Sequence, residues 1–535
     1  MSKKRQSTFL ANLPGSILLI CFLCSFEVQA LQVDAAQKAL REKFGSEWAT
    51  QDAAVDKQLR SLTARFERRP NILVILADDI GWGELGSYGG GKLKGAPTPA
   101  LDQMADEGMR FLSHYTEPSC TPTRVALMTG RHPVRTGLDE VLFPGQVKGL
   151  VADEVTLAEV LSEAGYATGM FGKWHLGELQ EHQPQYQGFD YAYYNLYNGA
   201  IWPWRENATH YDTENDTGIT GPPYFIDIPE AYEETFDIPL HGIMRAKRNT
   251  PAEEIDPLSL SRFNTFDNEL TDEVIAFMRD QHEAGIPFFA YFATNTQQVF
   301  SCPDVDSPYL DKSNCQARQL VQHDKNMARL FESLDNMGID ENTLVLWISD
   351  NGPMNKFYPS TGFSWLRGYK SEVYEGGVRT PGIAKWPGSI APGQTPIDIV
   401  HVSDWYTTIA NLAGAKAAIP DDRVIDGVDQ RSLLFNGEGY SRRDYVFFYR
   451  YIAYKNLSST GPASMLSAIR MGDIKFHLQS GEIYNLLRDP VESHPGRREY
   501  LWAMQPIRRM IWEHRAMMKK YPNRVIEETA GGKVD

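Results

Sequence analysis

Short, nearly continuous apolar runs alternate with helical patterns from Pro70 onward. Four of these runs are rich in β-branched or aromatic residues, which is typical of strands that are buried on both faces. They are NILVILA (71–77), YATGMF (166–171), PFFAYFAT (287–294) and TLVLWIS (343–349). Helical segments lie between them, one of them beginning at Thr98 and another ending at Gly338. The alternation predicts an α/β fold in which a large, mostly parallel sheet is sandwiched by helices.

Both ends of the chain depart from this pattern. Residues 31–69 are polar, and their apolar positions recur at helical spacing at Val55, Leu59, Leu62 and Phe66. We therefore expect a helical N-terminal extension over 31–69, followed by a main domain over 70–439. The last hundred residues contain hairpin-like runs such as DYVFFYRYIAY (444–454). They predict a smaller C-terminal α+β subdomain over 440–535, with an antiparallel sheet.

The first 30 residues have the layout of a secretory signal peptide. A charged start precedes an apolar run of ten residues from Ile17 to Phe26, and small residues lead up to Ala30. A membrane-spanning helix needs about 18 apolar residues or more, which this run does not reach. We therefore expect residues 1–30 to be removed and the protein to be exported, either periplasmic or secreted, without stable membrane insertion.

Charge and cysteine content narrow the possible partners. The 535-residue chain has 53 Lys and Arg against 69 Asp and Glu, so its net charge is -16, which opposes extensive contact with nucleic acid. Without the signal peptide the cysteines are Cys120, Cys302 and Cys315. In an oxidising compartment Cys302 and Cys315 could pair, which would leave Cys120 as an unpaired thiol. Alternatively, all three are reduced and buried.

Polar residues follow each predicted strand, where open α/β sheets bind their ligands. Asp78 and Asp79 follow the first run and Asp350 and Asn351 follow the last, while the second is followed by Lys173 and His175. A single Asp at such a place is commonly a turn or a helix cap. Three carboxylates brought together from two strands, however, indicate a bound cation. Since all four donors offer oxygen, Ca²⁺ fits better than zinc, and Mg²⁺ stays possible.

A second group of residues lies in the segment SCTPTRVALMTGRHP. Cys120, Pro122 and Arg124 form a C-x-P-x-R pattern in which the proline belongs in the first turn of a helix. The cysteine would then lie at the helix N-terminus, where free N–H groups and the helix dipole favour anions. The pattern predicts a reactive cysteine beside an anion site, and a buried structural cysteine is the alternative.

These motifs together resemble those of type I, formylglycine-dependent sulfatases, which are arylsulfatase-like enzymes of the alkaline-phosphatase-like superfamily. The resemblance covers the chain from Pro70 to about Pro490. It is carried by six ordered segments: RPNILVILADDIGWGELGSYG, CTPTRVALMTGRHPVRTGL, FGKWHLGE, SDNGP, YEGGVRTPGIAKWPG and IYNLLRDPVES. The implied fold is the alkaline-phosphatase-like sheet, and the implied activity is that of a sulfuric ester hydrolase.

The resemblance also implies a role for each motif residue. Cys120 would be oxidised to formylglycine (3-oxoalanine) by a formylglycine-generating or an anaerobic sulfatase-maturating enzyme. One divalent ion, usually calcium, would be bound by Asp78, Asp79, Asp350, Asn351 and the modified side chain of residue 120. Arg124 would orient the nucleophile. The sulfate or the leaving oxygen would be contacted by Lys173, His175 and Lys370.

One position departs from the family pattern. Many sulfatases have a His shortly after the PFF strand that helps to protonate the departing alcohol, and Gln298 stands there in this chain. Because Gln cannot act as a general acid, either Lys370 or His175 delivers the proton, or the leaving group needs little help.

The substrate is suggested by residues 186–211, which are dense in Tyr and Trp. Trp202 and Trp204 could stack on sugar or aryl rings, or the segment could pack the domain's own loops. An exported acidic enzyme of this kind suggests a sulfated carbohydrate as substrate, with aryl sulfates also hydrolysed.

Three rival functions remain at this point. A phosphate or phosphonate ester hydrolase of the same superfamily could use the same nucleophile and metal. A non-catalytic sulfatase-like binding protein would lack the cysteine or the metal-binding aspartates, and both are present. A plain cysteine hydrolase would need a His–Asp pair beside Cys120.

Overall fold

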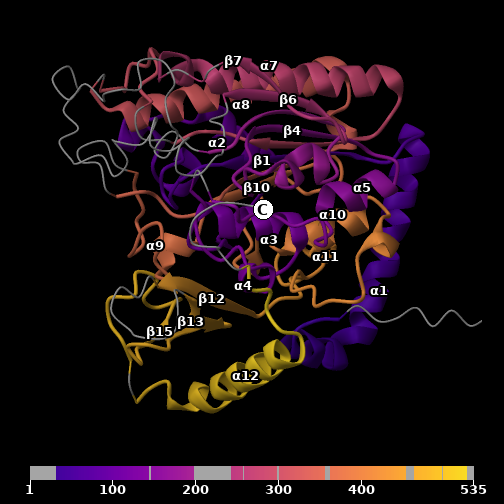
Figure 1. The fold of residues 1–535 in the computed structure, drawn as a ribbon. Coiled ribbons are helices and arrows are strands. Elements are labelled where there is room, and N and C mark those ends of the chain that lie inside the picture. The colour runs from indigo at the N-terminus through magenta and orange to yellow at the C-terminus, as the bar shows by residue number, and fades with distance from the viewer. Residues whose placement is uncertain are drawn as a thin grey trace, which may run out of the picture.

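The computed structural model describes residues 32–526 apart from 144–145, 198–241, 257, 259, 298–300, 312, 356–361, 453–462 and 497. The expected signal peptide lies outside the described residues. Within them, nine strands form one large sheet (Figure 1). Its spatial order is β2 (Met109–Arg110), β10 (Gly382–Lys385), β9 (Thr343–Ser349), β1 (Asn71–Ala77), β8 (Phe288–Ala293), β4 (Ala167–Lys173), β5 (Tyr191–Asn195), β6 (Ile243–Lys247) and β7 (Glu253–Asp256).

The centre of this sheet is parallel and its edges are antiparallel. β1 lies between β8 and β9 and runs parallel to both, and β4 runs parallel to β8 and β5. At the edges, β10, β2, β6 and β7 are antiparallel to their neighbours. All residues of β1, β8 and β9 are buried, which explains why their sequences are almost continuously apolar. The predicted α/β class with a mostly parallel sheet is confirmed.

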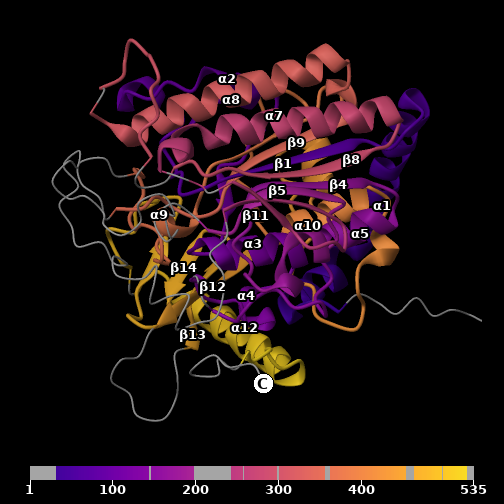
Figure 2. The same cartoon turned by 45° about the horizontal axis from the view of Figure 1, so that its top comes forward.

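Helices cover both faces of the sheet (Figure 2). One face carries α2 (Pro99–Glu107), α7 (Leu260–Ala284) and α8 (Cys315–Met337), and the other carries α3 (Cys120–Thr129), α5 (Leu157–Glu163) and α10 (Asp404–Leu412). Local sequence sets their ends: a Thr156–Glu159 capping box begins α5, and Gly338 ends α8 in a left-handed conformation. Shorter helices are α4 (Pro133–Thr136), α9 (Glu375–Val378), α11 (Arg431–Asn436) and the 3₁₀ turns Gly86–Tyr88, Gly91–Lys94, Gln180–His182, Pro184–Tyr186, Asp340–Asn342 and Lys416–Ala418.

The C-terminal part of the chain has its own apolar cluster. An antiparallel sheet is formed by β12 (Tyr445–Ile452), β13 (Ala463–Met471), β14 (Ile474–His477) and β15 (Ile483–Asn485). The final helix, α12 (Leu501–Lys520), packs its buried residues against Tyr445, Phe447 and Ile469 of this sheet. A separate parallel pair is made by β3 (Ser113–Tyr115) and β11 (Ile399–His401). The predicted antiparallel C-terminal sheet is therefore present.

A long helix near the N-terminus joins the two parts. α1 (Ala35–Phe66) begins where the Asp34 side chain accepts a hydrogen bond from the N–H of Ala36. Near its start Ala36 and Leu40 pack against the C-terminal cluster, whereas Leu59 and Leu62 pack against the main core.

Two further features bear on the sequence predictions. Cys302 and Cys315 form a disulfide, and Cys120 is a free, buried cysteine. In the part of the chain that the structure describes, no helix is both long and apolar enough to cross a membrane.

Candidate active site

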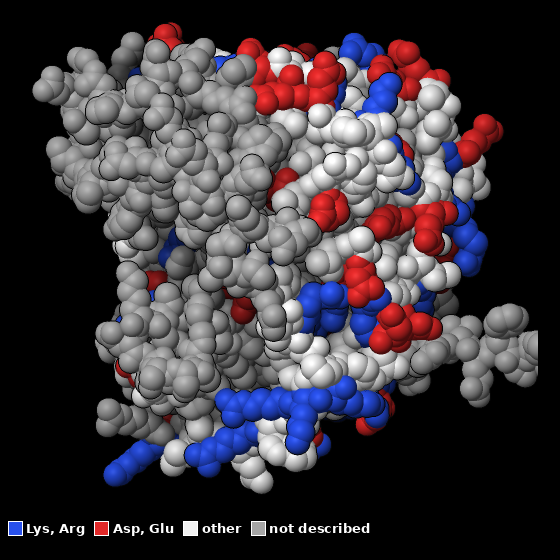
Figure 3. All heavy atoms as spheres, viewed as in Figure 1, with Lys and Arg blue, Asp and Glu red and all other residues white. Residues whose placement is uncertain are grey.

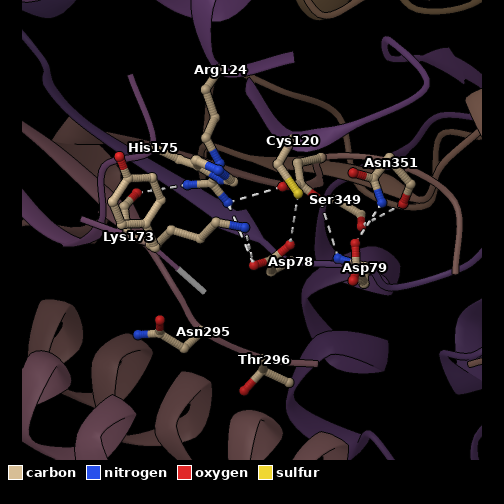
Figure 4. A network of polar contacts seen from close by, with 12 residues as sticks. Asp78, Asp79, Cys120, Arg124, Lys173, His175, Asn295, Thr296, Ser349 and Asn351 are labelled. Atoms are coloured by element: carbon tan, nitrogen blue, oxygen red, sulfur yellow. Dashed lines mark hydrogen bonds and ion pairs between the residues drawn. The ribbon is translucent and has the colours of Figure 1, made fainter. Parts of the chain in front are cut away.

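The predicted polar residues lie together at the carboxyl ends of three central strands of the sheet (Figure 4). Asp78 and Asp79 follow β1, Asp350 and Asn351 follow β9, and Lys173 ends β4. All five side chains are buried. The backbone N–H of Asp79 donates to Asp350 Oδ1 (3.1 Å), which ties the two strand ends together. Neighbouring parallel strands thus place carboxylates side by side that are far apart in the sequence.

Cys120 is the first residue of α3, and its side chain points toward these carboxylates (Figure 4). Its Sγ lies 3.5 Å from Asp78 Oδ1. One ligand atom from each of Asp78, Asp79, Cys120 and Asp350 lies within 4.8 Å of the others. We call these four residues the sheet-end cluster. Cys120 is buried, as the structural alternative required, but it faces acids rather than apolar packing.

Three cationic side chains surround the sheet-end cluster. Arg124 donates through Nη2 to Asp350 Oδ2 (2.9 Å) and through Nη1 to the carbonyl of Lys173 (2.7 Å). The ammonium of Lys173 lies 2.5 Å from Asp78 Oδ2. Lys370 reaches in from the loop before α9, where its Nζ lies 2.6 Å from Asp79 Oδ1 and 3.0 Å from the sulfur of Cys120.

Burial and crowding shift the ionisation of the cluster. Burial, together with the neighbouring charge of Asp350, raises the pKa of Asp78 to about 7. Burial also acts to raise the pKa of Asp350, but Arg124, Lys173 and Lys370 outweigh it and hold the pKa below its usual value. Burial and the charges of Asp350 and Asp78 raise the pKa of the Cys120 thiol to about 12. An unmodified thiol there would be protonated at neutral pH and a poor nucleophile.

His175 lies beside the cluster with its ring fixed. Its Nε2 lies 2.9 Å from the carbonyl of Leu142, an acceptor that places the ring proton on Nε2. Its Nδ1 is buried and has no hydrogen-bond partner among the described residues. Burial and the charges of Lys173 and Arg124 hold the pKa of His175 well below its usual value. Asp79 and His175 both have left-handed backbones, with φ of 60° and 59°, a conformation that is uncommon in non-glycine residues.

The oxygen atoms of the site fit a hard divalent cation. The three carboxylates offer oxygen ligands, and Asn351 Nδ2 donates to Asp79 Oδ1 (2.6 Å), which directs the amide toward them. Asn351 Oδ1 is buried and has no hydrogen-bond partner among the described residues. An unpaired buried carbonyl next to crowded carboxylates is the arrangement that an oxygen-seeking ion would complete.

The three predicted substrate-binding residues, Gln298, Trp202 and Trp204, lie outside the described residues. Part of the aromatic segment around the two tryptophans is described, however. β5 takes up Tyr191–Asn195, where Tyr193 and Tyr194 are buried in the core. For these tyrosines the alternative interpretation, internal packing, is the correct one.

Further residues support the site. Asn295 follows the predicted strand PFFAYFAT, whereas the sequence did not single out Asn195, Asp267 and Thr296. Asn195 ends β5, and its Nδ2 donates to Asn295 Oδ1 (2.8 Å). Asp267 of α7 accepts from the N–H of Asn295 (2.9 Å) and from Thr296 Oγ1 (2.8 Å). The N–H of Asp78 donates to the carbonyl of Thr296 (2.6 Å), so this network holds the backbone next to the cluster. Asn195 follows the same strand-end rule as the other residues, but the run YAYYN was too polar to be recognised as a strand.

A large cavity lies near the amino ends of the strands, at the opposite end of the sheet from the sheet-end cluster. Its volume is about 710 Å³, and it is lined by Tyr166, Ala167 and Tyr191 near the amino ends of β4 and β5. The sheet-end cluster lies at the carboxyl ends of the strands. We therefore assign the active site from the grouping of reactive side chains and not from cavity size.

Comparison with known proteins identifies the family. The family model described as Sulfatase matches residues 70–415, and the model described as N-sulphoglucosamine sulphohydrolase, C-terminal, matches residues 365–519. The chain belongs to the sulfatase family. It is similar to human arylsulfatase A, with 37% identity over 399 residues that cover 71% of each chain.

Two further relatives agree with this assignment. N-acetylgalactosamine-6-sulfatase of rat is 33% identical over 435 residues, which cover 78% of this chain and 73% of the relative. The crystal structure of PsFucS1 sulfatase from Pseudoalteromonas sp. superimposes with a TM-score of 0.74 and 30% identity, covering 89% of this chain and 96% of that structure. The alkaline-phosphatase-like fold and the activity of a sulfuric ester hydrolase, both expected from the motifs, are confirmed.

Proposed function

We propose that this sulfatase removes sulfate from a sulfated carbohydrate, using formylglycine made from Cys120 beside a bound Ca²⁺ ion. The observation that carries the proposal is the position of Cys120. Its sulfur lies at the N-terminus of α3, within reach of three buried carboxylates and 3.0 Å from the ammonium of Lys370. Among the described residues, this sulfur forms hydrogen bonds with Asp78 and Lys370 and with no histidine, so a plain cysteine hydrolase is not favoured.

The proposed cation ligands are Asp78, Asp79, Asp350 and Asn351, together with the modified side chain of residue 120. When bound, the ion would supply positive charge to the sulfate oxygens. The hydrated aldehyde of formylglycine would supply two hydroxyls: one to attack sulfur, and a second whose loss of a proton would expel sulfate and regenerate the aldehyde. Ca²⁺ suits the all-oxygen donor set, and Mg²⁺ is the alternative.

The basic residues would bind and orient the ester. Arg124 is fixed by Asp350 and the carbonyl of Lys173, so its planar guanidinium would hold the side chain of residue 120 in a defined direction. Lys173 and Lys370 would place ammonium groups against the sulfate. With every group in its usual protonation state, three carboxylates and three cationic side chains cancel. A divalent ion and a singly charged ester then leave the site at plus one, which favours charge building up on the leaving oxygen.

The proton for the leaving alcohol is assigned to Lys370. Of the two candidates, His175 has its Nε2 engaged by the carbonyl of Leu142 (2.9 Å), which leaves Lys370 as the proposed donor. His175 would instead contact the sulfate. Because Gln298 cannot donate in place of the usual histidine, a Gln298→His variant should help poor leaving groups, such as sugar alcohols, more than activated phenols. Equal effects on both classes would remove this role for the position.

A sulfated sugar is the proposed substrate, with aryl sulfates as further substrates. One relative is named for an N-acetylgalactosamine sulfate and another for aryl sulfates. Trp202 and Trp204 remain proposed contacts for the sugar ring. We also propose export after removal of residues 1–30, and a domain boundary near residue 440, shortly before β12.

Mass spectrometry of the peptide that contains Cys120 tests the proposal. The protein would be produced with and without a formylglycine-generating enzyme and assayed on nitrophenyl sulfate and nitrophenyl phosphate. We expect activity to follow the fraction of aldehyde at residue 120, to be lost with a chelator and restored by Ca²⁺, and to favour the sulfate ester. Full activity from protein that carries only a thiol at residue 120 would contradict the proposal that formylglycine is the nucleophile. A preference for the phosphate ester would support the rival function, a phosphate or phosphonate ester hydrolase. A screen of sulfated monosaccharides then identifies the sugar.

A further inference from the structure

The last helix, α12, has a charge opposite to that of the chain as a whole. It contains five basic residues, Arg508, Arg509, Arg515, Lys519 and Lys520, and one acid, Glu513. Its net charge of +4 within a chain of -16 means that the remaining residues together carry -20. Lys and Arg side chains gather along the lower edge of the molecule in Figure 3, where Figure 1 places α12.

One face of α12 anchors the helix. Ala503, Ile507, Ile511 and His514 recur at helical spacing, and all four are buried. Ile507 and Ile511 join the apolar cluster of the C-terminal sheet. His514 Nδ1 lies 2.6 Å from Asp34 Oδ2, next to the start of α1. The helix is therefore held by its inner face, and its outer face is free to serve another purpose.

The outer face combines cations with exposed tryptophans. Arg508, Trp512, Arg515 and Lys519 follow one another at intervals of four, three and four residues, which places them on one side of the helix. We call these four residues the α12 stripe. Arg508 and Lys519 are about 16 Å apart along the helix axis. Trp512 is 71% exposed and Trp502, in the first turn of the helix, is 65% exposed.

The acid of α12 does not neutralise the stripe. Glu513 forms its ion pair with Arg509 (2.8 Å), and both residues lie to one side of the α12 stripe. The three cations of the stripe form no ion pair among the described residues. Both charge and apolar surface are therefore presented to solvent on the same row of side chains.

We propose that the α12 stripe binds a sulfated polysaccharide and holds the enzyme on a polymer, at a surface separate from the sheet-end cluster. Guanidinium and ammonium groups form charge-assisted hydrogen bonds with sulfate oxygens. The ring of Trp512 offers a flat apolar face on which a sugar ring can stack between two bound sulfates. That the bound polymer is also the substrate rests on the proposed function, whereas binding to the stripe does not.

Other occupants suit this surface less well. A membrane-binding helix buries a continuous apolar face in the lipid, but the apolar face of α12 is already packed against the C-terminal sheet. Two copies of the chain joined stripe to stripe about a two-fold axis would bring like charges together. A sulfated polysaccharide meets both the charge and the isolated tryptophan ring.

Charge reversal tests the stripe directly. A triple variant of the full-length enzyme, Arg508→Glu, Arg515→Glu and Lys519→Glu, would be compared with wild type for binding to immobilised dextran sulfate at physiological ionic strength. We expect the apparent Kd to rise by about tenfold or more, and the slope of log Kd against log salt concentration to fall by about two to three. The matched control is Lys57→Glu, Arg60→Glu and Lys416→Glu, which makes the same charge change at exposed positions elsewhere. It should bind within about twofold of wild type.

The tryptophan has a test of its own. Trp512→Ala should weaken binding to dextran sulfate by about threefold to tenfold, the range that a stacked ring contributes. The same variant should bind polyvinyl sulfate, which carries sulfate but no sugar ring, as wild type does. An equal loss on both polymers would remove the stacking role of Trp512.

Several results would overturn the proposal. Equal binding by the stripe variant and the control variant would do so, as would tighter binding of wild type to phosphatidylglycerol vesicles or to a DNA duplex than to dextran sulfate. The stripe variant should keep wild-type turnover of nitrophenyl sulfate, because the cluster that carries the chemistry lies at the end of the large sheet. If that variant folds poorly, Arg508→Gln, Arg515→Gln and Lys519→Gln replace it. If no sulfate ester is hydrolysed by wild type, the proposed function fails while polymer binding can still be measured.

Discussion

Two buried groups of charges in this molecule differ in how closely their carboxylates are crowded together. In the sheet-end cluster, ligand atoms from three carboxylates and Cys120 lie within 4.8 Å of one another. The second group, which we call the junction cluster, consists of Asp404, Asp426, Arg135 and Arg443 and lies between the main core and the C-terminal sheet. There, each carboxylate has an arginine of its own.

In the junction cluster, each buried carboxylate is paired with an arginine of the same chain. Asp404 accepts from Arg443 through both oxygens and also from the N–H groups of Val428 and His401. Arg135 holds both oxygens of Asp426 (2.8 and 3.0 Å). Although burial acts to raise the pKa of Asp426, Arg135 outweighs it and keeps that pKa below its usual value. These contacts give each buried carboxylate an arginine partner and link the main core to Arg443, shortly before β12.

In the sheet-end cluster, the pKa of one carboxylate is raised instead of lowered. The pKa of Asp78 rises to about 7 because burial and Asp350 act together, even though Lys173 lies 2.5 Å away. Asp78 has a cationic partner, yet its pKa is raised, because burial and the crowding of like charges around it outweigh that partner. The comparison teaches that crowding of like charges, and not burial or ion pairing alone, marks the sheet-end cluster as the candidate ligand site.

Removal of the nucleophile should have the largest effect. Cys120→Ala should lower turnover of nitrophenyl sulfate by more than about 10⁴-fold, because no other group at the site can form the covalent sulfate ester. The melting temperature should stay close to that of wild type. Cys120→Ser should be nearly as inactive unless a serine-converting maturase is present. Substantial activity from the alanine variant would contradict the assignment of catalysis to residue 120 of the sheet-end cluster.

In the junction cluster, loss of one partner should reduce stability instead of catalysis. Arg443→Met leaves Asp404 buried without its cation and should lower the free energy of unfolding by about 3–5 kcal/mol. Urea unfolding measures this, and turnover per folded molecule should not change. Arg65→Met, which breaks an exposed ion pair with Glu341, is the control and should cost less than about 1 kcal/mol. A fully stable Arg443→Met protein would mean that this cluster is not structural.

Loss of a single carboxylate from the sheet-end cluster should reduce activity without reducing stability. Asp79→Asn should lower activity on the order of a hundredfold. In a chelator its melting temperature should equal or exceed that of wild type, because a like charge has been removed from the crowd. Scanning calorimetry should also show that the rise in melting temperature produced by Ca²⁺ is lost. Asp106→Asn, at an exposed position of α2, should retain that rise. A wild-type response in Asp79→Asn would argue against this ligand.

The smallest expected effect is a loss of stability at acidic pH, caused by the buried, neutral side chain of His114. His114 accepts a hydrogen bond from Trp405 Nε1 (3.1 Å) next to Asp404, and burial lowers its pKa from 6.5 to about 3. The folded state therefore binds fewer protons than the unfolded state below pH 6.5, and stability falls as the pH drops toward 3. Each pH unit below 6.5 should cost about 1.4 kcal/mol. Urea unfolding of wild type and His114→Gln between pH 7 and 5 should show a shallower slope for the variant; equal slopes would assign the effect to other groups.

Much of the fold could be read from local patterns. The runs NILVILA and TLVLWIS are β1 and β9 residue for residue, and the run PFFAYFAT contains β8, because a strand covered on both faces must be apolar at every position. β5 was missed for the same reason, since tyrosines and an asparagine interrupt its apolar character. The antiparallel edge strands were also missed, because short strands at an edge have no strong pattern of their own.

The sequence by itself determined which residues are the candidates for the chemistry: acids and amides directly after buried strands, and a cysteine in the first turn of a helix. These features are local, because chain direction and residue type decide them. The tertiary structure alone decided that β1 lies between β8 and β9, that Lys370 reaches the sulfur of Cys120 across 250 residues, and that α12 packs its apolar face on the C-terminal sheet. Such contacts depend on sheet order and on packing between distant segments, which no local pattern of residues specifies.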